Sequence, residues 1–362
     1  MSDESYIQLA IEIAKKGMGN VSPNPLVGCV IVKNERIIGA GYHEKIGQNH
    51  AEINAINSSP ENLEGSTLYV NLEPCSHYGK TPPCVDSIIE KKIKRVVIGT
   101  LDMNPLVCGK GVKKLKKAGI DVKVGILEKE CEKLNKFFFK YISKKIPYVT
   151  LKAAQTIDGK IADQNGYSKW VSSVDSRRHV HSHRSKYDAV LIGAGTVAKD
   201  DPSLTVRLVE GRNPQRIILD TKLRLKSSQK LFRNNSDKNL IVVTSEKSIS
   251  KKNKIKKLNS SGINIIHVKE DEYGNLDLKS ILKELGKLSI TSVLVEGGNK
   301  IFTSFVKNNL YDDILLFITP KILGKGVSAI GDLGIYDIRK AVKVKVKAVE
   351  TIGDDILVEL VK

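Results

Sequence analysis

The sequence predicts two consecutive α/β domains, and three observations carry this prediction. First, 362 residues are too many for one ordinary hydrophobic core and suit two. Second, short apolar runs typical of strands alternate with segments of helical periodicity along the whole chain. Third, the stretch SKKIPYV interrupts a helical pattern with charged residues and Pro147 before a strand pattern starts at about Tyr148. We therefore expect domains at residues 1–146 and 147–362.

The first domain shows its elements in close succession. Residues 1–17 begin with acidic residues, carry apolar side chains at helical spacing and end in two lysines and a glycine, which predicts a helix. Residues 26–43 read as a hairpin that turns at Lys33–Glu35. Further strands are expected at 66–72 and 95–100, and helices at 50–56, 84–93, 112–119 and 128–142. This order indicates an α/β sandwich.

The second domain repeats the alternation of strands and helices. Strands are predicted at 148–154, 188–194, 216–220, 240–245, 263–268, 292–298 and 313–320, with helices between them. The polar segment 225–239 is expected to be a surface loop. The strand that ends in Gly297 and Gly298 runs into a helix, so free backbone N–H groups and the helix dipole would face an anionic phosphate.

The composition excludes some classes of protein but does not indicate which reaction, if any, the protein catalyses. The net charge of +19 comes from 59 Lys and Arg residues spread along the chain, which indicates solvated helix faces and long-range attraction of phosphorylated small substrates. Five cysteines give an odd count and no disulfide framework, so we expect a reducing cytoplasm. Neither membrane insertion nor nucleic-acid binding is expected, and self-association into a homo-oligomer is left open.

The most specific chemical signal lies between His50 and Cys84. His50, Cys75 and Cys84 supply nitrogen and sulfur donors of the kind that zinc prefers, and three protein ligands leave a fourth position for water. Glu52 follows His50 by two residues, as in H-x-E deaminase sites, where the glutamate moves protons without binding the metal. Two prolines before Cys84 place that thiol at a helix N-terminus, which would lower its pKa.

Two alternative readings of this stretch remain. A structural zinc would need a fourth protein ligand, which His43, His77 or Cys108 could supply, but it would leave Glu52 without a role. The two cysteines and the histidine could also stand together by chance. In nucleic-acid deaminases the cysteines lie three residues apart, whereas here the eight residues SHYGKTPP separate them and carry His77 and Lys80 as a polar rim suited to a phosphate.

Longer motifs resemble one enzyme family in both halves. SPNPLVGCVIV, HAE and EPCSHYGKTPPC resemble the deaminase half of the bifunctional deaminase and reductase of riboflavin biosynthesis. KAAQTIDGKIA, GYSKWVSS, GAGTVAKDDPSLTVR, VEGG and TPKILGKG resemble its reductase half, in the same order. The resemblance implies a cytidine-deaminase-like three-layer α/β/α domain with one Zn²⁺ per chain, followed by a dihydrofolate-reductase-like α/β domain that uses NADPH.

The resemblance also implies residue roles. Glu52 would exchange protons during hydrolytic deamination of 2,5-diamino-6-(5-phosphoribosylamino)pyrimidin-4(3H)-one, while Asn24 would hold the base and His77 and Lys80 the polar end. Lys152 and Asp200 would stand at the carbon that is reduced to give 5-amino-6-(5-phosphoribitylamino)uracil. The remaining substrate positions are Ser168, Arg184, Leu204, Arg207 and Glu296, with the two arginines as phosphate forks. The NADPH positions are Ala154, Trp170, Thr196, Asp200, Thr221, Gly298, Asn299, Lys300, Ile301, Phe302, Thr303 and Ser304.

Two other function classes compete with this reading. A nucleic-acid deaminase with a basic appended domain would show a short P-C-x-x-C motif and stacking aromatics, but aromatic residues make up only 5% of this chain. A non-catalytic protein with structural zinc would be indifferent to replacement of Glu52 by Gln. Residue spacing alone leaves the order of the two reactions open, and the resemblance favours deamination first.

Overall fold

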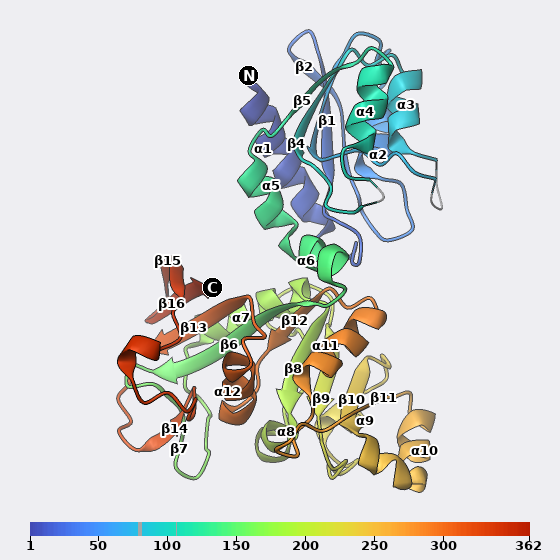
Figure 1. Cartoon of the computed structure of the whole chain (residues 1–362). Helices are drawn as coiled ribbons and strands as arrows, with labels where there is room; N and C mark the ends of the chain where they lie inside the picture. Colours follow the sequence, from blue (N-terminus) through green and yellow to red (C-terminus); the bar gives the residue numbers. More distant parts are fainter. Residues whose placement is uncertain (79–81, 106) are drawn as a thin grey trace. The chain divides into compact units, whose positions relative to one another are not determined.

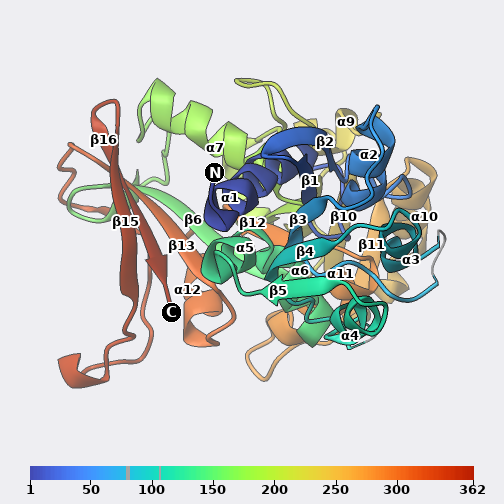
Figure 2. The ribbon, with the colours of Figure 1, turned by 90° about the horizontal axis from the view of Figure 1, so that it is seen from above.

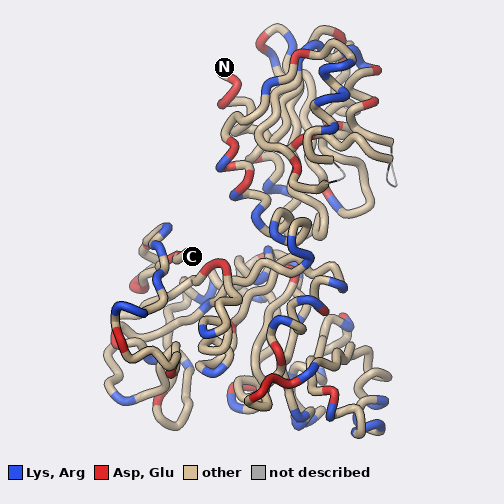
Figure 3. Tube along the Cα trace, viewed as in Figure 1, with Lys and Arg blue, Asp and Glu red and all other residues tan. Residues whose placement is uncertain are grey.

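The computed structural model describes residues 1–78, 82–105 and 107–362. The chain divides into two compact units, Met1–Lys145 and Ile146–Lys362, which are described separately below. Lys and Arg are scattered along the chain of both units and are interspersed with Asp and Glu (Figure 3). In the described part of the chain, no helix is both long enough and apolar enough to cross a membrane.

The first unit is a five-stranded sheet between two layers of helices (Figure 1). Its strands lie in the order β2-β1-β3-β4-β5; β1 pairs antiparallel with β2 and β3, and the other pairs are parallel. The strands are β1 (Gly28–Lys33), β2 (Arg36–Tyr42), β3 (Thr67–Leu72), β4 (Arg95–Thr100) and β5 (Asp121–Val124). The helices are α1 (Asp3–Ala14), η1 (Lys15–Gly17), α2 (Ala51–Ser58), α3 (Cys84–Glu90), α4 (Lys110–Lys117), α5 (Glu128–Leu134) and α6 (Lys136–Lys144).

Alternation along β1 separates the two cores of this unit. Cys29 and Ile31 face the cluster that α2, α3 and α4 complete, whereas Val30 and Val32 face α1 and α5. The hairpin turn lies where we predicted it, because Asn34 and the residue after it adopt positive φ angles of 49° and 60°, as a two-residue turn of this hand requires. The three-layer sandwich is thus confirmed.

The single helix predicted at 128–142 is wrong in one respect, because the chain breaks it into α5 and α6 at Asn135. The side chain of Asn135 accepts a hydrogen bond from the backbone N–H of Leu26 at 2.7 Å and donates to the Leu26 carbonyl at 3.0 Å. Asn135 itself has φ −101° and ψ 18°, outside ideal helix geometry. A contact across 109 residues of sequence therefore overrides a helical periodicity that looks continuous.

The second unit contains a nine-stranded sheet in the order β11-β10-β9-β8-β12-β6-β13-β16-β15, parallel from β11 to β13 and antiparallel beyond. Figure 2 shows the C-terminal hairpin β15–β16, in red, at the edge of this sheet. The strands are β6 (Tyr148–Thr156), β7 (Lys160–Asp163), β8 (Ala189–Gly193), β9 (Gln215–Leu219), β10 (Leu240–Ser245), β11 (Asn264–Val268), β12 (Ser292–Val295), β13 (Asp313–Thr319), β14 (Gly326–Ser328), β15 (Lys345–Ile352) and β16 (Asp355–Val361), of which β7 and β14 form a separate pair. The helices are α7 (Val174–Lys186), α8 (Ala194–Asp200), α9 (Lys230–Arg233), η2 (Glu246–Ser250), α10 (Lys252–Ser260), α11 (Leu278–Lys287), α12 (Asn299–Lys307) and η3 (Ile338–Lys340).

The seven strands predicted for this unit are all present, and the helix expected after Gly298 begins at Asn299. The surface loop expected at 225–239 is wrong in part. It contains α9, whose Leu231 is fully buried, and Asn235 is buried beside the guanidinium of Arg216. Leu231 and Asn235 anchor this segment in the interior, but composition does not reveal them because each stands alone in a run of polar residues.

Candidate active sites

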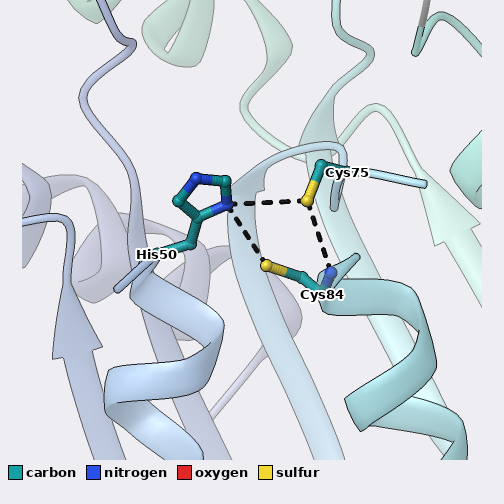
Figure 4. Close-up of side chains that lie close together, drawn as sticks. All are labelled: His50, Cys75 and Cys84. Atoms are coloured by element: carbon teal, nitrogen blue, oxygen red, sulfur yellow. Dashed lines mark hydrogen bonds between the residues drawn. The ribbon is translucent and has the colours of Figure 1, made fainter. Parts of the chain in front are cut away.

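Three side chains meet at the edge of the first unit as the H-x-E and cysteine spacing predicts. His50 is the residue before α2, Cys75 follows β3, and Cys84 opens α3. The His50 Nδ1 atom lies 3.5 Å from the Cys75 sulfur and 3.3 Å from the Cys84 sulfur (Figure 4). All three donor atoms lie within 4.8 Å of one another, so one ion could contact them together.

The chemistry of these donors fits zinc. One imidazole nitrogen and two sulfurs form the N/S set that zinc selects, and three ligands are the number found in catalytic sites. The side chain of Glu52, the second residue of α2, is buried with 3% exposure and interacts with the thiol of Cys84. Burial raises the pKa of Glu52 to about 7. A carboxyl group of this kind can both accept and release a proton near neutral pH.

The two thiols differ from our expectation in their pKa values. We assigned the lowered pKa to Cys84, but the neighbouring Cys84 thiol lowers the pKa of Cys75, and Cys75 in turn raises that of Cys84. The first backbone N–H of α3, that of Cys84, points at the Cys75 sulfur at 3.3 Å. The helix N-terminus therefore favours a thiolate on Cys75 rather than on Cys84.

The other residues predicted around this site have different placements. The side-chain amide of Asn24 lies 3.1 Å from the Nε2 atom of His43, whose Nδ1 contacts the backbone carbonyl of Asn49 at 2.9 Å. His43 thus holds Asn24 in place and is not part of the ligand group, a role that the sequence analysis missed. Cys108 is exposed and is likewise absent from that group among the described residues. His77 is exposed on the loop before Cys84, and Lys80 lies outside the described residues.

A second residue that sequence reasoning missed is Glu73, which is buried at the end of β3. Its carboxylate accepts hydrogen bonds from the backbone N–H groups of Gly109 at 2.9 Å, Val112 at 3.2 Å and Asp102 at 3.3 Å. These bonds tie the segment after β4 and the start of α4 to the strand that leads to Cys75. The signal was available in the sequence, since an acidic residue rarely ends a buried strand without a partner.

In the second unit, one cavity of ≈ 1130 Å³ collects the predicted reductase residues along the carboxyl ends of the parallel strands. Neighbouring strands β6, β12, β8 and β9 each lead into its wall. The predicted residues that line it are Lys152, Ala154, Ser168, Trp170, Arg184, Thr196, Asp200, Leu204, Arg207, Thr221, Glu296, Gly298, Asn299, Lys300, Ile301, Phe302 and Ser304. The exception is Thr303, whose hydroxyl donates to the Asn299 carbonyl and accepts the Gly331 N–H.

A charged cluster occupies the inner wall of this cavity. Arg184 donates from Nε and Nη2 to the two oxygens of Glu296 at 2.6 and 2.8 Å, and both side chains are about nine-tenths buried. Lys152 projects from β6 toward this pair, with its Nζ 5.6 Å from the ring centre of Phe317, and burial lowers its pKa. Two nitrogens of the Arg184 guanidinium therefore bind Glu296 rather than a phosphate, which corrects our expectation. The third nitrogen, Nη1, is not bonded to Glu296 and can make other contacts.

The opposite wall has the features of a diphosphate site. The N-termini of α8 and α12 approach each other so closely that a Cβ on Gly298 would lie 3.2 Å from the Thr196 hydroxyl. Gly298 precedes the first turn of α12, whose backbone N–H groups lack intrahelical acceptors. Two helix N-termini at the carboxyl edge of a parallel sheet suit an anionic diphosphate, so the residues present fit a dinucleotide.

His181, on α7, was not predicted as a site residue and lies in the same cavity wall. It is buried with 4% exposure, and each of its ring nitrogens faces a nitrogen of a predicted substrate residue. The residue is inconspicuous in the sequence, because α7 carries three histidines and only their positions in the fold distinguish them.

Comparisons with known proteins agree with these two sites. The cytidine and deoxycytidylate deaminase zinc-binding region matches residues 1–100, and the RibD C-terminal domain matches residues 147–358. The riboflavin biosynthesis protein RibD of Aquifex aeolicus is 48% identical over 98% of this chain and 97% of its own length. The RibD protein of Escherichia coli is 36% identical over the full length of both chains.

Solved structures agree as well. A diaminohydroxyphosphoribosylaminopyrimidine deaminase/5-amino-6-(5-phosphoribosylamino)uracil reductase from Thermotoga maritima is 45% identical, with a TM-score of 0.87 over 99% of this chain and 98% of that one. Acinetobacter baumannii RibD is 35% identical, with a TM-score of 0.89 over the same shares of the two chains. The chain therefore belongs to the RibD family, the bifunctional enzymes that carry a zinc-binding deaminase domain and a reductase domain for riboflavin biosynthesis.

Proposed function

We propose that the first unit deaminates 2,5-diamino-6-(5-phosphoribosylamino)pyrimidin-4(3H)-one and that the second unit reduces the product with NADPH. The observation that carries the first half is the convergence of His50, Cys75 and Cys84 beside the buried carboxyl group of Glu52. The cavity with Lys152 at one end and two helix N-termini at the other supports the second half.

For deamination, one zinc ion at the three ligands would supply electrophilic activation of water. Glu52 would accept a proton from the attacking water and pass it to the ring nitrogen, then accept the second proton from the new C–OH group and pass it to the departing amine. The carbon thus gains a C–O bond and loses its C–N bond, and ammonia leaves. Asn24, whose side-chain amide contacts His43, would hold the base through its amide group.

For reduction, bound NADPH supplies a hydride to C1′ of the ribosyl group. The bond between C1′ and the ring oxygen breaks, the oxygen takes a proton and the exocyclic N–H gives one up, which leaves a C=N group. Hydride would then add to C1′ and one proton to the nitrogen. Lys152 is the proton donor that best fits, because burial lowers its pKa and the carboxylate of Glu296 faces it. Asp200, which accepts a hydrogen bond from the Ser168 hydroxyl at 3.3 Å, is the second polar group at this end.

The order of strands supports an extended dinucleotide as the cofactor. From β6, which carries Lys152 and Ala154, to β9, which leads to Thr221, there are three strand spacings, or about 14 Å. The nicotinamide would lie over β6, the diphosphate at the helix N-termini that follow β12 and β8, and the adenosine beyond β9. Residues at the ends of all four strands line one cavity.

The test is to incubate the zinc-loaded protein with the diamino substrate, first without and then with NADPH. We expect ammonia release without NADPH and oxidation of NADPH only after its addition, with the ribityl product identified by mass. Release of ammonia without any later NADPH oxidation would reject the reductase half. Absence of both signals in a zinc-replete sample would reject the proposal.

A further inference from the structure

We propose that His181 binds the phosphate of the reductase substrate together with Arg184 and Arg207. The proposal rests on the reductase function above and assigns a site residue that the sequence motifs do not mark. His181 lies on α7, lines the same cavity as both arginines and contacts each of them.

The hydrogen bonds of His181 fix which ring nitrogen carries the proton. The backbone N–H of Arg207 donates to Nδ1 at 3.0 Å, so Nδ1 must be the acceptor of a neutral imidazole. The proton then resides on Nε2, which lies 3.4 Å from Nη1 of Arg184. Nη1 carries only N–H groups, so two donors face each other. An oxygen anion that enters from the cavity would accept from both.

The charges around this pair favour an anion. Arg184, Arg207 and Lys152 surround His181 with positive charge, and the carboxylate of Glu296 is the opposing negative charge. The two oxygens of Glu296 are already bonded to Nε and Nη2 of Arg184. The guanidinium of Arg207 has no ion-pair partner among the residues that the structure describes. A phosphate carries nearly two negative charges near neutral pH and three acceptor oxygens, which this group of donors can satisfy.

The position also separates this anion from the cofactor. The elements suited to the diphosphate are the N-termini of α8 and α12, whereas His181 lies on α7 and Arg207 lies three residues after Leu204. Leu204 is buried with a positive φ of 55°, and the Arg184 Nη1 atom donates to the Thr205 carbonyl at 3.2 Å, so the segment leading to Arg207 is held in place. The hydrogen bond from the Arg207 backbone N–H to Nδ1 of His181 holds the end of this segment.

Two substitutions distinguish the roles of the two ring nitrogens of His181. His181→Asn keeps an amide oxygen near the Nδ1 position and removes the Nε2 donor, whereas His181→Gln places an amide N–H near Nε2 and loses the bond to Arg207. Each variant is saturated with NADP⁺, which cannot donate a hydride, and titrated calorimetrically with 5-amino-6-(5-phosphoribosylamino)uracil and with its dephosphorylated form. NADP⁺ affinity, measured separately, shows that each variant has folded.

We expect His181→Asn to weaken binding of the phosphorylated compound about 10- to 100-fold, as loss of a charge-assisted hydrogen bond predicts, and to leave the dephosphorylated compound within about twofold. His181→Gln should retain more of the preference for phosphate than His181→Asn. Equal losses for both compounds, or equal affinity of the wild-type protein for both, would overturn the proposal. Phosphate preference without hydride transfer from NADPH in the wild-type protein would reject the reductase function and leave the phosphate site standing.

Discussion

The buried pair of Arg184 and Glu296 makes a prediction about stability that can be worked out from the structure. In Glu296→Gln, the guanidinium of Arg184 remains buried without its negative partner. Breaking a buried ion pair on one side costs about 3–5 kcal/mol. The pKa of Glu296 gives an independent figure: burial raises it, the bonded guanidinium of Arg184 lowers it by more, and it falls from 4.5 to about 2. That depression corresponds to roughly 3 kcal/mol of native-state stabilisation.

The sign of the pH dependence follows from the same shift. A carboxyl group with a depressed native pKa stabilises the fold above its unfolded value and loses this contribution as pH falls from about 4.5 toward 2. Stability of the wild-type second unit should therefore decline over that range more steeply than stability of Glu296→Gln. The two proteins should differ most near neutral pH and least near pH 2.

Differential scanning calorimetry is the assay, and the transition of the second unit is the one that does not shift when a zinc chelator is added. Glu284→Gln is a matched control, because Glu284 pairs with Lys287 on an exposed helix surface and should lose less than about 0.5 kcal/mol. Replacing Arg184 and Glu296 together by Leu should cost less than Glu296→Gln alone, since no charge is left unpaired. Equal stability of Glu296→Gln and Glu284→Gln would refute the reasoning.

Three further predictions concern the other groups. Glu52→Gln should reduce ammonia release by at least about 1000-fold, since proton transfer is lost in both directions. Zinc content and NADPH-dependent reduction of the deaminated compound should stay at wild-type levels. Unaltered ammonia release would contradict the role of Glu52. Cys84→Ala should lower bound zinc, measured by atomic absorption after dialysis, well below one ion per chain and abolish deamination but not reduction, and full zinc retention would exclude Cys84 as a ligand. Gly28→Ala should destabilise the first unit by roughly 2–3 kcal/mol in urea unfolding, because the new Cβ would lie 2.1 Å from the Ala10 carbonyl oxygen of α1, and an unchanged midpoint would show that α1 can move away.

Local spacing was sufficient to predict the deaminase site. The H-x-E pattern puts His50 and Glu52 at the start of one helix, and the apolar run before Cys75 indicates a strand that ends at the same edge. The start of this helix and the end of this strand depend on residues that are near one another in sequence, so hydrophobic periodicity and turn residues predict them. The reductase motifs likewise led to one cavity, although Thr303 turns toward Gly331.

The partners of the reductase residues could not be predicted, because they are distant in sequence. Arg184 and Glu296 are separated by 112 residues and meet only when α7 and the end of β12 pack at one edge of the sheet. The break at Asn135 has the same origin, since its partner Leu26 lies 109 residues away in sequence. In each case the position of a side chain depends on a backbone group or a charge far away in sequence, so no local pattern reveals it. Fold class, in contrast, depends on many apolar positions that repeat the same signal along the chain.

The division of the chain at Lys145 has a genetic consequence. The three proposed zinc ligands and Glu52 all precede that residue, the cavity residues all follow it, and neither sheet includes a strand from the other unit. A mutation that removes the chemistry of one centre therefore leaves every named group of the other intact. Two alleles, one defective in each half, should complement when expressed in the same cell, so the locus would score as two genes in a complementation test.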